Sequence, residues 1–444
     1  MEEIGLDVLK APVKTAYFQL LTMAIGGSFA GCIFSMVDAM VVGKYHGPVG
    51  TAALAVVGPV LAILYGLGFL TGIGGSVWFS NLRGSGKKEQ ADAFFTVSVI
   101  LSGMLSAVVL LVLLRFAEPI LRLFGSDDTL LILGKQYLKG IWIALPCCII
   151  TNLLAAYIRN DGNPVLVTVS VLAGGIVNVI GDIFLVFVCN MGIYGAGLAT
   201  GVSMITTTLI MLSHFLTPKN TMRLVKPQGF LEKTGKIVVG GFSTAINDIA
   251  MGLLGVIFNR QIMKYLNTDA LAVYGILSQI TVFVQCCAYS TGQAAQPILS
   301  QNLGAKQPIR IRECLRYGLY TTCLFGILWT VMALRIPNTF VRLFMTPTAS
   351  ILSIAPKIIG VYGLSFLPLT VNVFAIFYFQ SILRSAAATT VSLARGFVVS
   401  GGAAVLLPML FGPDALWLAM LFADLLVGAF SVMCMVKYTK QLEK

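Results

Sequence analysis

The chain has 444 residues, of which 57% are hydrophobic and only 11% are charged. Soluble domains carry about a quarter charged residues, so this composition excludes an ordinary water-soluble protein and indicates a surface that faces lipid. The net charge of +12 does not require a nucleic-acid partner, because membrane proteins concentrate Lys and Arg in cytoplasmic loops. We therefore expect no nucleic-acid partner.

Apolar windows long enough to cross the hydrocarbon core of a bilayer recur along the whole chain. This pattern predicts an all-α membrane protein with twelve transmembrane helices. In chain order, the predicted spans are 16–43, 52–79, 92–115, 137–158, 165–188, 192–216, 237–263, 270–298, 314–335, 357–383, 388–411 and 414–436.

Basic residues are distributed unevenly over the loops that connect these spans. With the N-terminus inside, about 20 of the 30 Lys and Arg fall in cytoplasmic segments and about nine in external loops. This bias predicts a multi-pass protein of the cell membrane with both termini in the cytoplasm. A long polar stretch predicts a cytoplasmic linker at 217–236, between an N-terminal lobe (1–216, spans 1–6) and a C-terminal lobe (237–444, spans 7–12).

The two predicted lobes repeat one another at an offset of about 220 residues. Ala53–Gly58 resembles Ala270–Gly275, and Asn152 falls opposite Asn372. Chance similarity between apolar segments is the alternative, but the matches extend into loops, where apolar bias cannot produce them. Six spans in each copy give both copies the same orientation, so we expect two six-helix bundles related by a pseudo-twofold axis along the membrane normal.

Four acidic residues fall inside predicted spans, and intramembrane acids outnumber bases, with Arg260 as the main exception. A carboxylate in the bilayer interior is costly, so each acid is expected to face the bundle interior or a cavity. Hydrogen bonding between packed helices is the structural alternative. The four acids are Asp38, Asp182, Asp248 and Asp424.

Two of these acids share one depth in the membrane with two further oxygen-bearing side chains. At about 1.5 Å rise per residue, Asp38 lies about 7 Å from the outer end of span 1 and Asp182 about 9 Å from that of span 5. Asn178 lies one turn deeper than Asp182 on the same face, and Thr200 lies about 12 Å inside span 6. This layer suits a hard cation or a proton shared between carboxylates.

Five ordered segments, together with the internal repeat, resemble the multidrug and toxic compound extrusion (MATE) family, and the likeness covers nearly the whole chain. The segments are Val37–Gly43, Arg159–Pro164, Asn178–Asp182, Gln296–Ala305 and Tyr378–Gln380.

This resemblance implies a cation-coupled antiporter of the branch whose cation site lies in the N-terminal lobe. The residues that match the cation site are Asp38, Asn178, Asp182 and Thr200. Sodium and a proton both remain open as the coupling ion. A tyrosine near the family's substrate cavity matches Tyr137, and we add Asn152 and Asp248 as candidate cavity residues.

Two segments depart from the family pattern. Many relatives carry a proline midway along span 1, where this chain has Met23–Gly27, and often a Gly-X-Pro in span 7, where it has Gly240–Phe242. Glycines still permit a bend, but a proline-kink mechanism does not apply directly.

The sequence thus predicts a monomeric antiporter, coupled to Na⁺ or H⁺, that exports cationic or amphipathic organic compounds and contacts membrane lipid. A lipid-linked oligosaccharide or lipid flippase of the same superfamily is the alternative. An intramembrane enzyme is disfavoured because His46 and His214 are the only histidines, and no cofactor is expected. A channel is disfavoured because no pore loop is recognisable.

Overall fold

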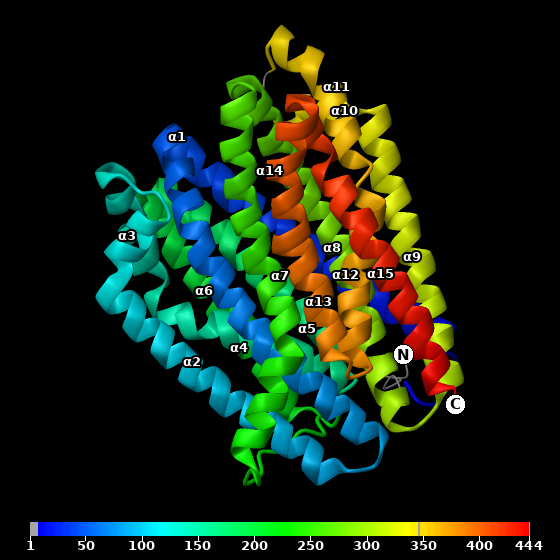
Figure 1. Ribbon diagram of the computed structural model, residues 1–444. Coiled ribbons are helices and arrows are strands. Elements are labelled where there is room, and N and C mark those ends of the chain that lie inside the picture. Colours follow the sequence, from blue (N-terminus) through cyan, green and yellow to red (C-terminus); the bar gives the residue numbers. More distant parts are fainter. Residues whose placement is uncertain (1–7, 345–346, 444) are drawn as a thin grey trace. The chain divides into compact units, whose positions relative to one another are not determined.

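The computed structural model describes residues 8–344 and 347–443, apart from the side chains of Pro48 and Asp248. Helices account for all regular elements in these ranges (Figure 1). Twelve helical segments of the described chain are long and apolar enough to cross a membrane, which confirms the predicted all-α class and number of spans.

Several spans contain a break or join a neighbour. α1 runs through two spans that meet at Gly47, whose φ of 65° interrupts the helix. Span 4 is formed by α3 and α4, span 10 by α11 and α12, and π-helical segments occur in spans 5 and 11. The elements are α1 (Val13–Gly84), α2 (Lys88–Leu123), α3 (Asp128–Ile141), η1 (Trp142–Ala144), α4 (Leu145–Asn160), α5 (Pro164–Gly181), η2 (Asp182–Val188), α6 (Gly192–Leu212), η3 (Ser213–Leu216), α7 (Phe230–Tyr265), α8 (Thr268–Gly304), α9 (Pro308–Arg335), α10 (Pro337–Phe344), α11 (Ala349–Gly363), α12 (Phe366–Ser381), α13 (Ser385–Leu393), η4 (Ala394–Val398), α14 (Val399–Phe411), η5 (Pro413–Leu418) and α15 (Ala419–Leu442).

The described chain divides into two compact units. Unit 1 comprises 8–11 and 22–245, and unit 2 comprises 12–21 and 246–443. The first turns of α1 belong to unit 2 because Tyr17 is buried there, with its hydroxyl 2.5 Å from that of Thr321 and its ring stacked on Tyr317. The unit boundary on the C-terminal side falls within α7.

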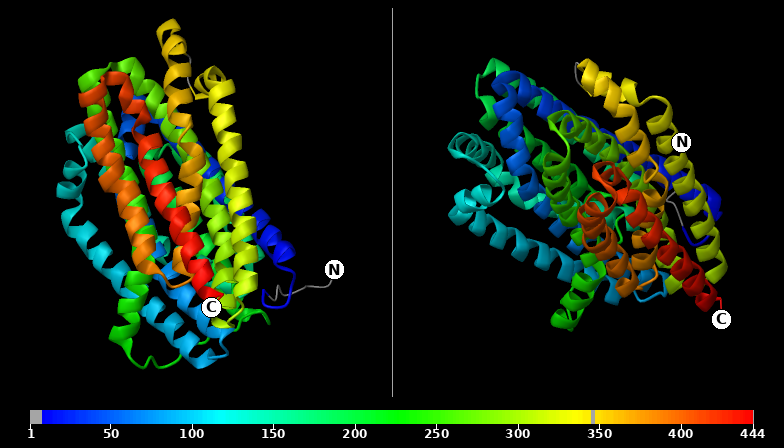
Figure 2. Two further views of the ribbon diagram at one scale, coloured as in Figure 1. Left: turned by 45° about the vertical axis from the view of Figure 1, so that its right-hand side comes forward. Right: turned by 45° about the horizontal axis from the view of Figure 1, so that its top comes forward.

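Each unit is built around one central helix. In unit 1, α6 lies against α3, α4 and α5. In unit 2, α12 is buried along almost its whole length and lies against α8, α9 and α15 (Figure 2). The segment Met23–Gly27 is helical, and the Thr168 hydroxyl of α5 donates to the Met23 carbonyl at 2.9 Å.

The turns between spans repeat along the chain. Gly86 and Lys306 both have left-handed φ angles, as do Gly162 and Leu383, and Gly192 and Gly412. The members of each pair lie about 220 residues apart, the offset of the sequence repeat. A non-glycine residue in this region of φ is strained. The second half of the chain therefore keeps the left-handed φ angle at these turns even where Lys306 and Leu383 stand in place of glycine.

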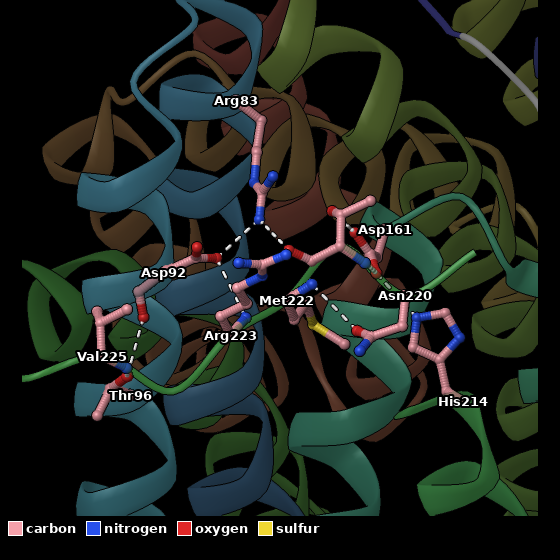
Figure 3. Close-up of polar contacts among 10 residues, drawn as sticks. Arg83, Asp92, Thr96, Asp161, His214, Asn220, Met222, Arg223 and Val225 are labelled. Atoms are coloured by element: carbon pink, nitrogen blue, oxygen red, sulfur yellow. Dashed lines mark hydrogen bonds and ion pairs between the residues drawn. The ribbon is translucent and has the colours of Figure 1, made fainter. Parts of the chain in front are cut away.

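Side chains at the ends of neighbouring helices bind the polar segment that follows α6 (Figure 3). Asp92 of α2 accepts from the Arg83 guanidinium at 2.7 Å and from the Arg223 backbone N–H at 3.3 Å. The Arg83 guanidinium also donates to the Thr221 carbonyl at 2.6 Å, and the Val225 N–H donates to the Thr96 hydroxyl at 3.0 Å. These bonds fix residues 221–225 without regular secondary structure.

The turn between α4 and α5 holds the same segment from a second side (Figure 3). The Asp161 carboxylate accepts from the Thr221 N–H at 2.9 Å and lies 2.8 Å from His214 Nε2. The Asn163 amide lies 3.1 Å from His214 Nδ1. If the amide donates to Nδ1, the neutral imidazole carries its proton on Nε2 and donates to Asp161. The Arg159–Pro164 segment of the family resemblance thus binds the chain that follows α6.

Unit 2 contains a buried ion pair. Arg395 Nε donates to Asp424 Oδ1 at 2.7 Å, and both side chains are fully buried. The Asn372 amide donates to the same oxygen at 3.1 Å, and an Arg395 nitrogen donates to Asn247 Oδ1 at 3.3 Å. The pair neutralises both charges in a region that neither could enter alone without a large desolvation cost.

Removing one partner of this pair should cost more than replacing both. Arg395→Met leaves the Asp424 carboxylate uncompensated, so we expect a loss of about 3–5 kcal/mol of stability. Arg395→Met combined with Asp424→Leu should recover most of that loss. Thermal unfolding of the purified variants in one detergent measures both effects, and equal losses in the single and double variants would contradict the expectation.

Candidate functional site

Four helical segments of unit 1 bring the predicted cation residues to one place. Asn178 lies in the last turn of α5, Asp182 begins η2, and Thr200 lies in α6. The Asn178 amide nitrogen is 3.4 Å from Thr200 Oγ1, and the Tyr137 hydroxyl of α3 is 3.2 Å from the same oxygen. Asp38 of α1 interacts with Tyr137. Tyr137, predicted for the substrate cavity, therefore contacts this cluster directly.

Small residues let the helices approach closely enough to form the cluster. A Cβ atom added at Gly197 of α6 would lie 2.3 Å from the Tyr137 carbonyl oxygen of α3. On the other side of α6, the Ser203 hydroxyl donates to the Gly174 carbonyl of α5 at 2.7 Å. Contacts of this kind allow helix backbones to pack tightly in membranes. They fix Tyr137, Asn178 and Thr200 as neighbours.

The C-terminal end of span 1 is tied to the turn between spans 5 and 6. His46 Nε2 accepts from the Ile193 backbone N–H at 3.0 Å, and the Tyr45 hydroxyl donates to the Asn190 side-chain oxygen. Gly192, in the same turn, has a φ of 55° and packs against His46. This attachment holds the part of α1 that carries Asp38 beside Asp182.

The two carboxylates differ in exposure and lack compensation. Asp182 is 0% exposed, and neither of its carboxylate oxygens has a hydrogen-bond partner in the described part of the chain. Asp38 is half-buried, and its Oδ1 is also without a partner there. The charge that acts on Asp182 is that of Asp38, which repels it. A buried polar group without a partner is costly, and a buried charge more so.

The donor set consists of oxygen atoms and fits a hard monovalent cation or a proton. The described residues contain no cluster of three or more His, Cys, Asp or Glu side chains, the grouping expected for a transition-metal centre. Two carboxylates, an amide, a hydroxyl and a phenol are available instead. The π-helical start of η2 places Asp182 where the regular backbone pattern of α5 changes, and such segments frequently occur at functional sites.

The remaining candidates lie apart from this cluster or outside the described residues. Asn152 of α4 is half-buried, its amide donates to the Cys148 carbonyl at 2.9 Å, and it packs against Gly68 of α1. The side chain of Asp248 lies outside the described residues. Tyr65, which the sequence reasoning missed, interacts electrostatically with Asp38 and Tyr137. Nothing in the sequence marks a single tyrosine within an apolar span as a site residue.

The expectation that Arg260 is the main intramembrane base was wrong. Arg260 is exposed, whereas Arg395 is fully buried in span 11 and paired with Asp424. Arg395 lies within the predicted range 388–411, so its position in that span was itself the signal. An intramembrane arginine implies an acidic partner, and Asp424 in the next span was available.

Packing at Gly197 should be intolerant of a single methyl group. Gly197→Ala places a Cβ against the Tyr137 carbonyl, so we expect a destabilisation of about 1–3 kcal/mol from overpacking. Gly58→Ala is the matched control, because a Cβ there meets no atom within 4 Å. Thermal unfolding in detergent measures both variants. Equal unfolding temperatures would show that α3 and α6 can separate without cost.

Solved structures of membrane transporters resemble this chain over its whole length. One described as an outward-facing conformation of a multidrug resistance MATE family transporter has a TM-score of 0.92 at 17% identity, covering 99% of each chain. A Vibrio cholerae MATE transporter mutant has a TM-score of 0.87 at 18% identity, covering 97% of each. At these identities the likeness shows the fold, and the fold is that of the MATE structures.

Curated relatives and a family model extend the comparison to the sequence. The multidrug export protein MepA of Staphylococcus aureus is 25% identical over 414 residues, covering 92% of this chain and 89% of the relative. MepA of Staphylococcus saprophyticus is 25% identical over 394 residues, covering 88% and 85%. The MatE family model matches residues 24–184 and 244–408. Since these matches take in most of the chain, the protein belongs to the MatE family of membrane transporters.

Proposed function

We propose that this protein is a cation-coupled antiporter that exports cationic or amphipathic organic compounds by alternating access. Its family and its relatives, which are named multidrug export proteins, support the export of organic molecules. The observation that carries the coupling is Asp182, a carboxylate with no exposed surface and no hydrogen-bond partner among the described residues. Such a group requires a positive charge from outside the chain.

The coupling ion would be a proton or a sodium ion held by the Asp38–Asp182 cluster. Two carboxylates in one buried site cannot both stay charged without compensation. Asp182 and Asp38 would supply the negative charge, and Asn178, Thr200 and Tyr137 would supply neutral oxygen atoms. With a proton, one carboxyl becomes neutral; with sodium, the oxygen atoms replace water around the ion.

Asp424, the buried acid in the second half of the chain, supports the proposal that the coupling site lies in the first half. Asp424 already has a cation within the chain, because Arg395 bonds to it at 2.7 Å. It therefore has no need of a proton or sodium ion, whereas Asp182 does. This contrast favours the branch of the family whose cation site lies in the N-terminal lobe.

Transport would follow from the preference of the ion for one arrangement of α1, α5 and α6. A ligand shifts a conformational equilibrium only by its differential affinity for the two states. Because the cluster draws on separate helices, a change in their packing changes its affinity for the ion. We propose that ion entry favours release of the organic substrate, and that substrate entry favours release of the ion.

The substrate would occupy a cavity to which Tyr137, Asn152 and Asp248 contribute. Tyr137 interacts with both Asp38 and Thr200. A substrate that contacts the Tyr137 ring would therefore be separated from the proposed ion site by this one side chain. Aromatic faces attract organic cations, which fits this role. The lobes 1–216 and 237–444, joined by the 217–236 linker, would be the parts that rock.

Neutralising either carboxylate should abolish coupling and leave the fold intact. Asp38→Asn and Asp182→Asn keep the shape of a protonated acid but cannot release a proton, and they hold sodium less well. Gradient-driven efflux of a fluorescent organic cation from proteoliposomes should fall to the rate seen without a gradient. Imposing pH and sodium gradients separately on the wild type identifies the ion.

Asp414→Asn is the matched control for these variants. Asp414 is exposed and pairs with Lys357 at the surface, and such a pair contributes little to stability. This variant should transport like the wild type. Wild-type efflux in both Asp38→Asn and Asp182→Asn, at equal reconstitution, would show that the cluster serves helix packing alone.

We also propose that the linker and both termini face the cytoplasm, on the basis of the Lys and Arg bias. Gln228→Cys in the linker should resist a membrane-impermeant thiol reagent in intact cells and react after permeabilisation. Asp414→Cys, in a loop on the opposite expected side, should react in intact cells. The wild type gives the background from native cysteines, and external labelling of Gln228→Cys would reverse the orientation.

A further inference from the structure

Unit 1 contains an apolar pocket that the proposed transport mechanism does not use. Its volume is about 530 Å³, within the range of about 300–1,000 Å³ of small-molecule sites. α2, α4, the end of α6 and the linker form its walls, with Phe95, Gly103, Leu154, Phe215, Met222 and Leu224 among the lining residues. None of the residues of the cation cluster lines it.

The linker closes one end of this pocket, and its position is fixed. Met222 is 2% exposed, and the residues on either side of it are bound to unit 1, Thr221 by Asp161 and Arg223 by Asp92 (Figure 3). Val225 is bound by Thr96. Because these bonds pass through the backbone, the pocket is formed before any ligand enters.

The pocket opens toward the lipid-facing surface of the spans. Leu212 of α6, at its edge, is 41% exposed, and Leu224 of the linker is 68% exposed. α2, α4 and α6 all belong to candidate membrane spans, so we infer that Leu212, exposed on α6, faces acyl chains, while Leu224 lies in the linker beside the ends of these spans. The molecule with direct access to the pocket is a membrane lipid.

The rim at the linker is positively charged. Residues 217–229 contain Lys219, Arg223 and Lys226 and no acid. The acids bound to this segment are Asp92, which is 6% exposed and pairs with Arg83, and Asp161, whose side chain is 3% exposed and lies against His214. Arg223 and Lys226 are exposed, and neither side chain has a partner in the described part of the chain. Arg223 and Lys226 lie close on either side of Leu224, which lines the pocket.

We propose that this pocket binds an anionic phospholipid, with one acyl chain in the apolar pocket and the phosphate headgroup paired with Arg223 and Lys226. Basic residues at the cytoplasmic ends of membrane helices are the recognised partners of anionic headgroups. The same charge repels the organic cations that the protein would export. A bound lipid contacts α2, α4 and the linker together and so strengthens the attachment of the linker to unit 1.

Two kinds of variant separate the acyl-chain contact from the headgroup contact. A Cβ added at Gly103 meets no atom within 4 Å, so Gly103→Leu has room to begin a side chain that extends into the pocket, and the more flexible Gly103→Met replaces it if the leucine variant is unstable. Arg223→Gln with Lys226→Gln removes the charge and leaves the pocket. The matched controls are Gly402→Leu, at another open glycine, and Lys440→Gln, at another exposed lysine.

The test is native mass spectrometry of the full-length, delipidated protein titrated with phosphatidylglycerol or phosphatidylcholine of identical acyl chains. We expect the wild type to prefer phosphatidylglycerol by about tenfold or more. Arg223→Gln/Lys226→Gln should lower phosphatidylglycerol affinity to that of phosphatidylcholine, Gly103→Leu should weaken both, and the controls should change neither. Unchanged phosphatidylglycerol affinity in either variant would overturn the proposal.

A parallel titration with a fluorescent organic cation distinguishes a lipid site from a drug site. The cation should bind wild type and Gly103→Leu equally, since its site lies elsewhere. Loss of cation binding in Gly103→Leu, with phosphatidylglycerol binding retained, would assign the pocket to the transported compound instead. Neither result depends on the coupling-ion proposal, because the titrations contain no ion gradient.

Discussion

The compensation of charge inside an apolar bundle is the constraint on which this structure depends. A carboxylate buried among membrane helices needs a positive charge or a proton nearby. Unit 2 meets this requirement within the chain, where Arg395 binds Asp424 and both are fully buried. Unit 1 does not: Asp182 has no exposed surface, no hydrogen-bond partner among the described residues, and only the like charge of Asp38 beside it. Asp424 is therefore compensated within the chain, whereas Asp182 is the acid to which we assign an ion from solution.

Close packing between the helices of unit 1 brings the polar side chains around Asp182 together in one cluster. Gly197 brings α6 against Tyr137, and Gly174 accepts a hydrogen bond from Ser203 across the α5–α6 contact. Larger residues would hold these backbones apart and leave Thr200 out of reach of both Tyr137 and Asn178. The cluster of Asp38, Tyr137, Asn178, Asp182 and Thr200 thus rests partly on glycines. Mutations at Gly197 or Gly174 would disturb this cluster without changing any of its polar side chains.

The linker between the halves is part of the folded structure of unit 1. Asp92, Thr96 and Asp161 bind its backbone, so its path is fixed by hydrogen bonds although it has no helix or strand. Two of these three residues are acids: Asp92 is 6% exposed, and the side chain of Asp161 is 3% exposed. Asp92 pairs with Arg83 and Asp161 lies against His214, so the exposed charged side chains within residues 217–229 are those of Arg223 and Lys226. The same segment contributes Met222 and Leu224 to the wall of the apolar pocket.

The sequence by itself determined the number of spans, and it predicts one depth for Asp38, Asn178, Asp182 and Thr200. Hydropathy and rise per residue are properties of each helix alone and need no knowledge of its neighbours. The position of Arg395 in span 11 could also be read from the sequence, but only the tertiary structure decided that Tyr137 joins this cluster and that Arg395 bonds to Asp424. These facts depend on the rotation of each helix about its axis and on which helices touch. That choice is made by packing between residues far apart in the chain, and no local pattern encodes it.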